Sequence, residues 1–204
     1  MHPETLNQET NDVFNLIKDC VPEFYLAGGT ALALELGHRI SVDLDFFCMD
    51  DFSTQDIRDR LIKKGTVEIT SLSGDTFNGL LNGVRISFFK YPYKLLFPPI
   101  KYSGVNLADE RDIAAMKILA ISDRGSKKDF IDLFMLLKKY SLKEIFIFFN
   151  EKYQDYNYNT LHILKSLVYF FDADENPEPV YINPINWIEA KNFINDTVNK
   201  FLEE

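Results

Sequence analysis

The sequence predicts an α+β protein in which a lobe of strands and helices, residues 1–107, precedes an all-helical lobe, residues 108–204. Two observations support this division. Short runs of alternating or β-branched residues, which are typical of strands, lie before residue 107, whereas helical patterns fill most of the chain after residue 109. Strands gathered in one part of a chain and helices in another are the pattern of α+β proteins.

Helical and strand patterns alternate in the first lobe. Helices are expected over residues 5–19, 30–37 and 53–65, with Pro22, Gly37 and Gly65 as their stops. Strands are expected over residues 23–27, 40–49, 66–72, 76–82 and 83–90, and the last three are joined by hairpin turns at Gly74-Asp75 and Asn82-Gly83. The segment 91–108 is rich in loops with short extended pieces.

The second lobe has helical patterns and no strand patterns. Helices are expected over residues 109–125, 127–140, 141–151, 158–171 and 184–203, with an acidic, proline-containing loop over 172–183. A chain of 204 residues with 46 % hydrophobic residues can bury one sizeable core or two smaller ones. We therefore expect both lobes to fold.

The charge of the chain limits its partners. The formal net charge is −9, which makes stable binding of duplex DNA unexpected, because phosphate binding needs a positive field. Two local basic segments, 58–64 and 123–130, are candidates for RNA contacts or are solvated helix faces. No apolar run approaches the roughly 18 residues that span a bilayer, so no membrane association is expected. The N-terminus lacks a secretory pattern, and Cys20 and Cys48 are too few for a disulfide framework, which favours the cytoplasm.

Two aspartates lie one residue apart in the run "ISVDLDFFCM", residues 40–49. On a strand, Asp43 and Asp45 would project from the same side, with Val42, Leu44 and Phe46 facing the core. Two close carboxylates repel each other, and a divalent cation that bridges them removes the repulsion. Hard oxygen ligands suit Mg²⁺, which takes one or two carboxylates together with phosphate oxygens. The alternative is that both are strand-edge charges or turn caps.

A pair of glycines precedes these aspartates. Gly28 and Gly29 lie where a strand turns into a short helix, so the backbone can approach a phosphate and the helix N-terminus can bind it. Thr30 can contact the same phosphate or serve as a plain N-cap. Glycine turn, short helix and paired carboxylates together are typical of a site for a nucleoside triphosphate and its metal.

The whole run "GGTALALELGHRISVDLDFF" resembles the AbiEii/AbiGii toxin family of bacterial abortive-infection systems, within the polymerase-β-type nucleotidyltransferase superfamily. A second segment, "DERDIAAMKILAISDRGSKKDFIDLFMLL" (109–137), is similar to the helical motifs of that family. The resemblance covers roughly residues 24–140. It implies a mixed-sheet nucleotidyltransferase lobe followed by a helical lobe, an NTP substrate, Mg²⁺ or Mn²⁺ as cofactor, and a cognate antitoxin protein.

The resemblance also implies roles for residues of the helical lobe. Lys117 would contact the triphosphate, although it could instead be a snorkelling surface lysine. Asp129 is expected as a site residue, with Asp132 on the same helix face, but an acid near a helix start is also favourable for dipole reasons alone. Arg124 would contact phosphate or end its helix with a positive charge. In the first lobe, Arg39 would hold a carboxylate or a phosphate.

One position departs from the superfamily pattern, in which a later strand carries a third carboxylate. The corresponding run here is "GVRISFFKY", and Ser87 stands at the candidate position. Either another acid such as Asp75 or Asp129 takes that role, or the enzyme works without a third acid, or the activity is reduced.

We expect an enzyme that transfers a nucleoside monophosphate from an NTP to an acceptor hydroxyl, on the 3′ end of RNA or tRNA or on a protein. The alternatives are a non-catalytic nucleotide or RNA binder and an enzyme that modifies a small molecule such as an antibiotic.

Overall fold

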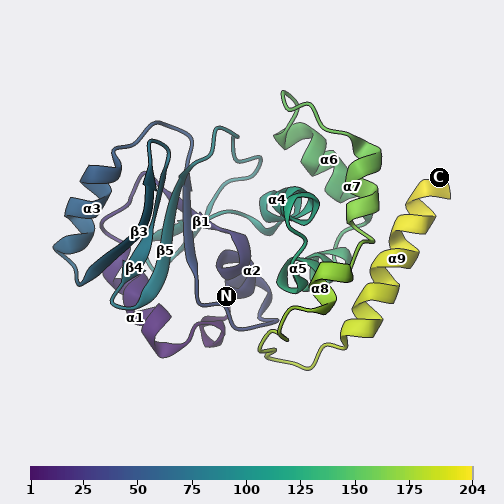
Figure 1. The fold of residues 1–204 in the computed structure, drawn as a ribbon, viewed down its shortest axis with the longest axis horizontal. Helices are drawn as coiled ribbons and strands as arrows, with labels where there is room; N and C mark the ends of the chain where they lie inside the picture. Colours follow the sequence, from purple (N-terminus) through teal and green to yellow (C-terminus); the bar gives the residue numbers. More distant parts are fainter. Residues whose placement is uncertain (204) are drawn as a thin grey trace. The chain divides into compact units, whose positions relative to one another are not determined.

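The computed structural model describes residues 1–203. The chain divides into two compact units, Met1–Asp109 and Glu110–Glu204, of which residue 204 is not described. The sequence placed this boundary between residues 107 and 108. No helix among the described residues is long and apolar enough to cross a bilayer. Within this part of the chain the fold is α+β, with strands in the first unit and helices alone in the second (Figure 1).

The first unit contains one mixed sheet with the strand order β3-β4-β5-β2-β1-β7-β6. Its strands are β1 (Tyr25–Ala27), β2 (Leu44–Cys48), β3 (Val67–Ser73), β4 (Thr76–Leu81), β5 (Val84–Lys90), β6 (Ile100–Tyr102) and β7 (Val105–Leu107). β2 pairs in parallel with β5 and antiparallel with β1, and β1 pairs in parallel with β7. β2 is therefore a central strand, with β1 on one side and β5 on the other.

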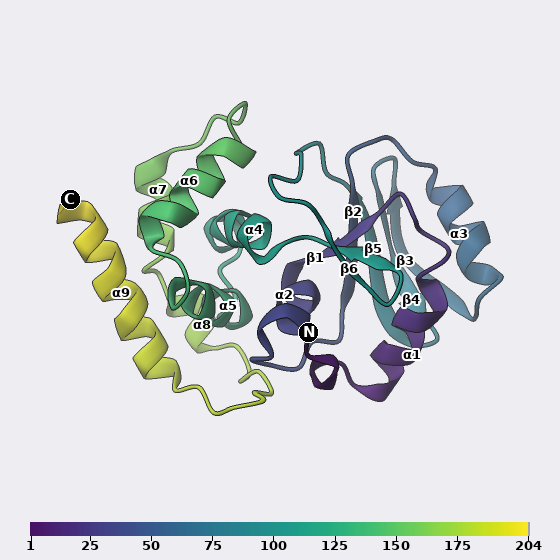
Figure 2. The ribbon, with the colours of Figure 1, turned by 180° about the vertical axis from the view of Figure 1, so that it is seen from behind.

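Three α-helices and a 3₁₀ turn complete this unit: η1 (Pro3–Thr5), α1 (Gln8–Ile17), α2 (Gly28–Leu36) and α3 (Thr54–Ile62). α1 and α3 lie beside the β3–β4–β5 part of the sheet and α2 beside β1, as both views show (Figures 1 and 2). The expected helix 5–19 is shorter than predicted, because the side chain of Asn7 caps a helix that begins only at Gln8.

Burial alternates along β2, so one face of the strand forms the core. Leu44, Phe46 and Cys48 are buried, and Phe46 stacks on Phe88 of β5 at 5.2 Å between ring centroids. The prediction that Val42 faces the core is wrong, since Val42 is 39 % exposed. The ladder with β1 begins only at Asp45, so residue 42 precedes the regular strand.

The second unit is all helical. Its elements are α4 (Glu110–Asp123), α5 (Lys127–Leu137), α6 (Leu142–Lys152), α7 (Thr160–Ser166), α8 (Phe171–Asp174) and α9 (Trp187–Glu203). The expected helix 158–171 is two helices, so residues 172–174, expected in a loop, are helical. An ion pair at 2.7 Å between Asp112 of α4 and Lys152 of α6, both fully buried, joins two of these helices. Burial lowers the pKa of Lys152, and hydrogen bonding to Asp112 opposes that shift.

Candidate active site

The glycine turn is the first element of the candidate site. β1 ends at Ala27, and Gly28 has a φ of +67°, in the left-handed region that favours glycine. This conformation lets the strand pass directly into α2, so both glycines belong to the first turn of the helix rather than to a loop before it. The first backbone N–H groups of a helix have no partner within the helix, and they form an anion-binding end.

Asp45 lies against this turn. Ala27 and Asp45 are partners in the β1–β2 register, and a Cβ added to Gly28 would lie 3.6 Å from Oδ2 of Asp45. The structure therefore brings together the two features that the sequence placed 17 residues apart, a glycine turn and a carboxylate. A phosphate bound at the start of α2 would lie next to the Asp45 carboxylate.

Asp43 immediately precedes β2 and is more open. Its side chain is 39 % exposed, and its Oδ1 lies 3.8 Å from Nε of Arg85 on β5. The backbone of Asp43 is fixed by Thr30, whose hydroxyl donates to the Asp43 carbonyl. Since that hydroxyl has one proton, the 2.8 Å bond between Thr30 and Ser41 is donated by Ser41. Thr30 is 2 % exposed, which gives its side chain a positioning role; its expected phosphate contact stays a prediction.

Gly29 is needed for a different reason. A Cβ at this position would come within 2.4 Å of Nη2 of Arg39, so the guanidinium packs against the bare glycine backbone. Arg39 is 2 % exposed and also donates to the carbonyl of Ile40 at 3.2 Å. The structure thus places Arg39 beneath the start of α2. Its expected contact with a nucleotide stays a prediction.

Ser87 stands beside Asp45, as the sequence predicted. The parallel register pairs Asp45 with Ser87, and the antiparallel register on the other side pairs Ser87 with Asn78 of β4. Asn78 in turn donates to the hydroxyl of Ser71 on β3 at 3.0 Å. A row of polar side chains therefore crosses four strands of the sheet, and Asp45 is the one carboxylate in it.

A second group of predicted residues comes together in the helical unit. Lys117 on α4 is buried, and its ammonium lies 2.8 Å from Oδ1 of Asp129 and 2.6 Å from Oδ2 of Asp132 on α5. Asp129 also accepts hydrogen bonds from Arg124 at 3.0 and 3.2 Å and from Ser126 at 2.7 Å. The i, i+3 spacing of the two aspartates is what lets both reach one lysine.

The surroundings of Asp129 keep it ionised. Burial raises its pKa, but the positive charges of Lys117 and Arg124 and their hydrogen bonds outweigh that effect, so the pKa lies well below its ordinary value. A carboxylate with so low a pKa is a weak proton acceptor. The geometry favours Asp129 as the residue that holds Lys117 and Arg124, while the catalytic role expected for it stays a prediction.

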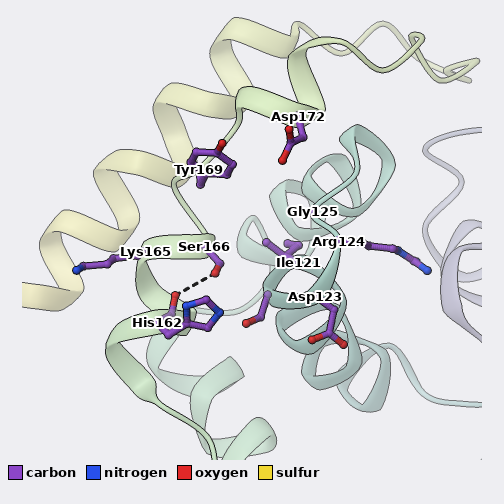
Figure 3. Close-up of a pocket in the computed structure, with 10 residues that line it drawn as sticks. Ile121, Asp123, Arg124, Gly125, His162, Lys165, Ser166, Tyr169 and Asp172 are labelled. Carbon is purple, nitrogen blue, oxygen red and sulfur yellow. Dashed lines mark hydrogen bonds between the residues drawn. The ribbon is translucent and has the colours of Figure 1, made fainter.

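A hollow of about 340 Å³ lies beside Arg124 in the helical unit, between the end of α4 and α7 (Figure 3). His162, Tyr169 and Asp172 line it, whereas the guanidinium of Arg124 extends away from it (Figure 3). Arg124 is therefore oriented toward its partner Asp129 and not into this hollow.

The two aspartates of the first unit fit a divalent metal by their chemistry. Both offer hard oxygen donors, and Mg²⁺ typically takes one or two carboxylates with the remaining ligands from water and substrate phosphates. Within residues 1–203, no group of three or more His, Cys, Asp or Glu side chains is placed to hold a metal ion. A metal at Asp43 and Asp45 would therefore take its remaining ligands from water or from substrate phosphates.

Sequence reasoning missed three residues that shape these groups. Arg85 faces Asp43, Ser41 anchors Thr30, and Ser126 binds Asp129. Arg85 could have been found, because it lies two residues before Ser87 on the same face of a strand. Ser41 and Ser126 carry no such signal.

Comparison with known proteins supports the interpretation of the first unit. Residues 19–87 match the family model described as nucleotidyl transferase AbiEii toxin, type IV TA system. The chain is 43 % identical over 189 residues to the uncharacterized protein aq_aa25 of Aquifex aeolicus, covering 89 % of each chain. It is thus similar along most of its length to a protein of nearly equal extent.

Two solved structures share the fold. JHP933 from Helicobacter pylori aligns with a TM-score of 0.61 and 15 % identity, over 96 % of this chain and 92 % of the other. MenT4, a nucleotidyltransferase toxin from Mycobacterium tuberculosis, aligns with a TM-score of 0.61 and 14 % identity, over 95 % and 86 % of the two chains. At such low identity these matches establish the arrangement of helices and strands and not the chemistry.

Proposed function

This chain belongs to the AbiEii family of nucleotidyltransferase toxins, and on that premise we propose that it transfers a nucleoside monophosphate from an NTP to an acceptor hydroxyl. The observation that carries the proposal is the close approach of the Asp45 carboxylate to the Gly28 turn. It supports a triphosphate held at the start of α2, next to the residues that would bind its metal. Membership of a type IV toxin–antitoxin family also implies a nucleotide substrate and a cognate antitoxin.

Each candidate site residue named below has a role in this proposal. Gly28 and Gly29 present backbone N–H groups to the phosphates, and Thr30 fixes the backbone of Asp43. Mg²⁺ or Mn²⁺ on Asp43 and Asp45 would supply positive charge that stabilises the phosphate oxygens in the transition state. Lys117 and Arg124 remain proposed phosphate contacts.

The reaction is an in-line displacement. The acceptor oxygen forms a bond to the α-phosphorus, the bond from that phosphorus to the bridging oxygen breaks, and pyrophosphate leaves. The acceptor proton passes to solvent or to a base. Ser87 is not that base, because a serine hydroxyl does not accept a proton at neutral pH.

A transfer assay with labelled NTP tests the proposal. The purified protein is incubated with Mg²⁺ and each α-³²P NTP, with total RNA, with no added acceptor, or with an aminoglycoside. We expect label in RNA or in the protein itself, and no label with Asp45→Asn. Label only in the aminoglycoside would make the enzyme one that modifies small molecules.

A non-catalytic nucleotide or RNA binder is the second candidate. The observation that favours it is Ser87 beside Asp45, where the superfamily pattern expects a carboxylate. Binding of NTP without transfer to any of these acceptors would establish this second candidate in place of the first.

A further inference from the structure

Arg85 on β5 is a cation that lies beside Asp43 of the candidate metal site. Its side chain is 70 % exposed, and Nε lies 3.8 Å from Oδ1 of Asp43. That separation is too long for a hydrogen bond, so the contact is a charge pair in solvent. Exposed pairs of this kind contribute little to stability and are easily exchanged for another partner.

The position of Arg85 in the sheet separates it from the glycine turn. β2 lies between β1, which leads into Gly28, and β5, which carries Arg85. A phosphate held by the start of α2 is thus on the β1 side of Asp45, whereas Arg85 reaches Asp43 from the β5 side. Arg85 is accordingly placed to meet a different phosphate from those at the glycine turn.

A cavity of about 490 Å³ opens on the same side. Asp43 and Arg85 both line it, together with Asn7, Glu9 and Thr10 at the start of α1 and the Asn82-Gly83 turn. Its size is within the range of sites that bind small molecules or single groups of a larger ligand. Since Glu9 and Asp43 are acidic, Arg85 is the group of this cavity that attracts an anion.

We propose that Arg85 is an exchangeable counter-cation of Asp43: it neutralises this carboxylate in the metal-free protein, and when a divalent cation binds it turns to a phosphate of a nucleic-acid acceptor in the neighbouring cavity. The inference rests on the proposed function, because it takes Asp43 as a metal ligand. It assigns the acceptor to the phosphate-bearing class, RNA, rather than to a protein hydroxyl. Arg85 acts as a positioning residue for the strand that carries the attacking hydroxyl.

Metal binding is the first test and needs no catalysis. Binding of Mn²⁺ to the full chain without nucleotide is measured by calorimetry for wild type, Arg85→Ala and Asp43→Asn. Because Arg85 competes with the metal for Asp43, Arg85→Ala should bind Mn²⁺ roughly three- to ten-fold more tightly. Arg58→Ala is the matched control, an exposed arginine 3.6 Å from Asp59 on α3, and it should bind Mn²⁺ like wild type.

Salt dependence is the second test. Binding of a single-stranded RNA oligonucleotide in Mn²⁺ is measured over a range of salt concentrations. The loss of one phosphate contact in Arg85→Ala should reduce the slope of log K against log salt by about 0.7. Arg85→Lys should keep most of that slope, and ATP binding should change less than RNA binding.

The outcomes separate this inference from the proposed function. Unchanged Mn²⁺ affinity in Arg85→Ala, with weakened affinity in Asp43→Asn, overturns the role of Arg85 and leaves the metal site standing. Unchanged affinity in Asp43→Asn removes the metal site, and the inference with it. A loss in ATP binding without a change in RNA binding would assign the phosphate to the nucleotide and overturn the acceptor assignment.

Discussion

Asp43 in the sheet unit and Asp129 in the helical unit are both carboxylates, yet their surroundings are opposite. Asp43 is 39 % exposed and has a charge pair at 3.8 Å, whereas Asp129 is 2 % exposed and bonded to Lys117, Arg124 and Ser126. The first carboxylate is open to a cation, and the second is already neutralised by the protein. Asp43 is thus available for the proposed metal, whereas the charges around Asp129 are already paired within the helical unit.

The largest effect is expected from breaking the charge cluster around Asp129. Lys117→Ala leaves Asp129 and Asp132 buried without their shared ammonium, and removal of one partner from a buried pair typically costs about 3–5 kcal/mol. Denaturant unfolding followed by fluorescence of Trp187, the single tryptophan of the sequence, measures this loss in the helical unit.

The same variant tests the predicted phosphate contact of Lys117. If the contact exists, triphosphate binding should weaken more than monophosphate binding, by the roughly 1.5–3 kcal/mol of a charged hydrogen bond. Equal losses for both ligands would leave Lys117 with the structural role alone.

Low pH should lower the stability of the helical unit. The pKa of Asp129 is lower in the folded than in the unfolded protein. Its contribution to the free energy of unfolding is therefore complete above about pH 4 and is lost as the pH falls further. Trp187 fluorescence against pH should therefore show a loss of stability on the acid side. Asp129→Asn should flatten this acid limb, and an unchanged limb would mean that other groups control it.

A substitution at the candidate metal site should change activity more than stability. Asp45→Asn should lower metal-dependent transfer by at least about 100-fold, because it removes a proposed metal ligand. The metal-free protein should be as stable as wild type or slightly more so, since one of two like charges is gone. The labelled-NTP assay measures transfer, and thermal shift with and without Mg²⁺ and NTP measures stability and ligand binding, with Asp59→Asn on α3 as control. Wild-type stabilisation by Mg-NTP in Asp45→Asn would show that the metal site is misplaced.

Local patterns in the sequence, together with the family resemblance, predicted the strand that lies beside Asp45. The hairpin at Asn82-Gly83 and the alternation along residues 83–90 predicted a strand, and the superfamily pattern placed Ser87 at the candidate position on it. The register shows that Ser87 is the neighbour of Asp45. The hairpin and the alternation are short-range signals, since a turn and a period of two residues determine them.

Contacts between distant elements could not be predicted in the same way. The packing of Arg39 on Gly29 and the sharing of Lys117 by two aspartates depend on how elements meet in space. Val42 continues the alternation of its neighbours but is exposed, because pairing with β1 starts only at Asp45. A period of two residues shows which side chains share a face, but not where the ladder begins.

Replacing Ser87 by an acid would add a carboxylate to the candidate metal site beside Asp45. Ser87→Asp places a carboxylate beside Asp45, which should tighten Mg²⁺ binding and raise transfer by about ten-fold, a part of the 10²–10⁴ that a general base can supply. The metal-free variant should lose up to about 1 kcal/mol, because like charges then face each other across two strands. Ser87→Asn has the shape of the aspartate variant without its charge, and it should change neither Mg²⁺ binding nor the transfer rate. An unchanged rate in Ser87→Asp, with transfer abolished in Asp129→Asn, would identify Asp129 as the missing acid.

The last expected effect concerns the backbone at the glycine turn. Gly28→Ala forces a side chain into a left-handed conformation, which costs about 1–2 kcal/mol, although its Cβ would stand at an ordinary contact distance of 3.6 Å from Asp45. Gly104→Ala is a matched control, since its φ is +88° and its Cβ would lie 3.6 Å from the side chain of Lys18.

Both variants should therefore lose a similar amount of stability in chemical denaturation. Only Gly28→Ala should also weaken the binding of Mg-NTP, because the added methyl group stands between the start of α2 and the Asp45 carboxylate, where the phosphate is expected. Equal nucleotide affinity in the two variants would mean that Gly28 serves only to turn the chain from β1 into α2, and the phosphate would then have to be held elsewhere in the sheet unit.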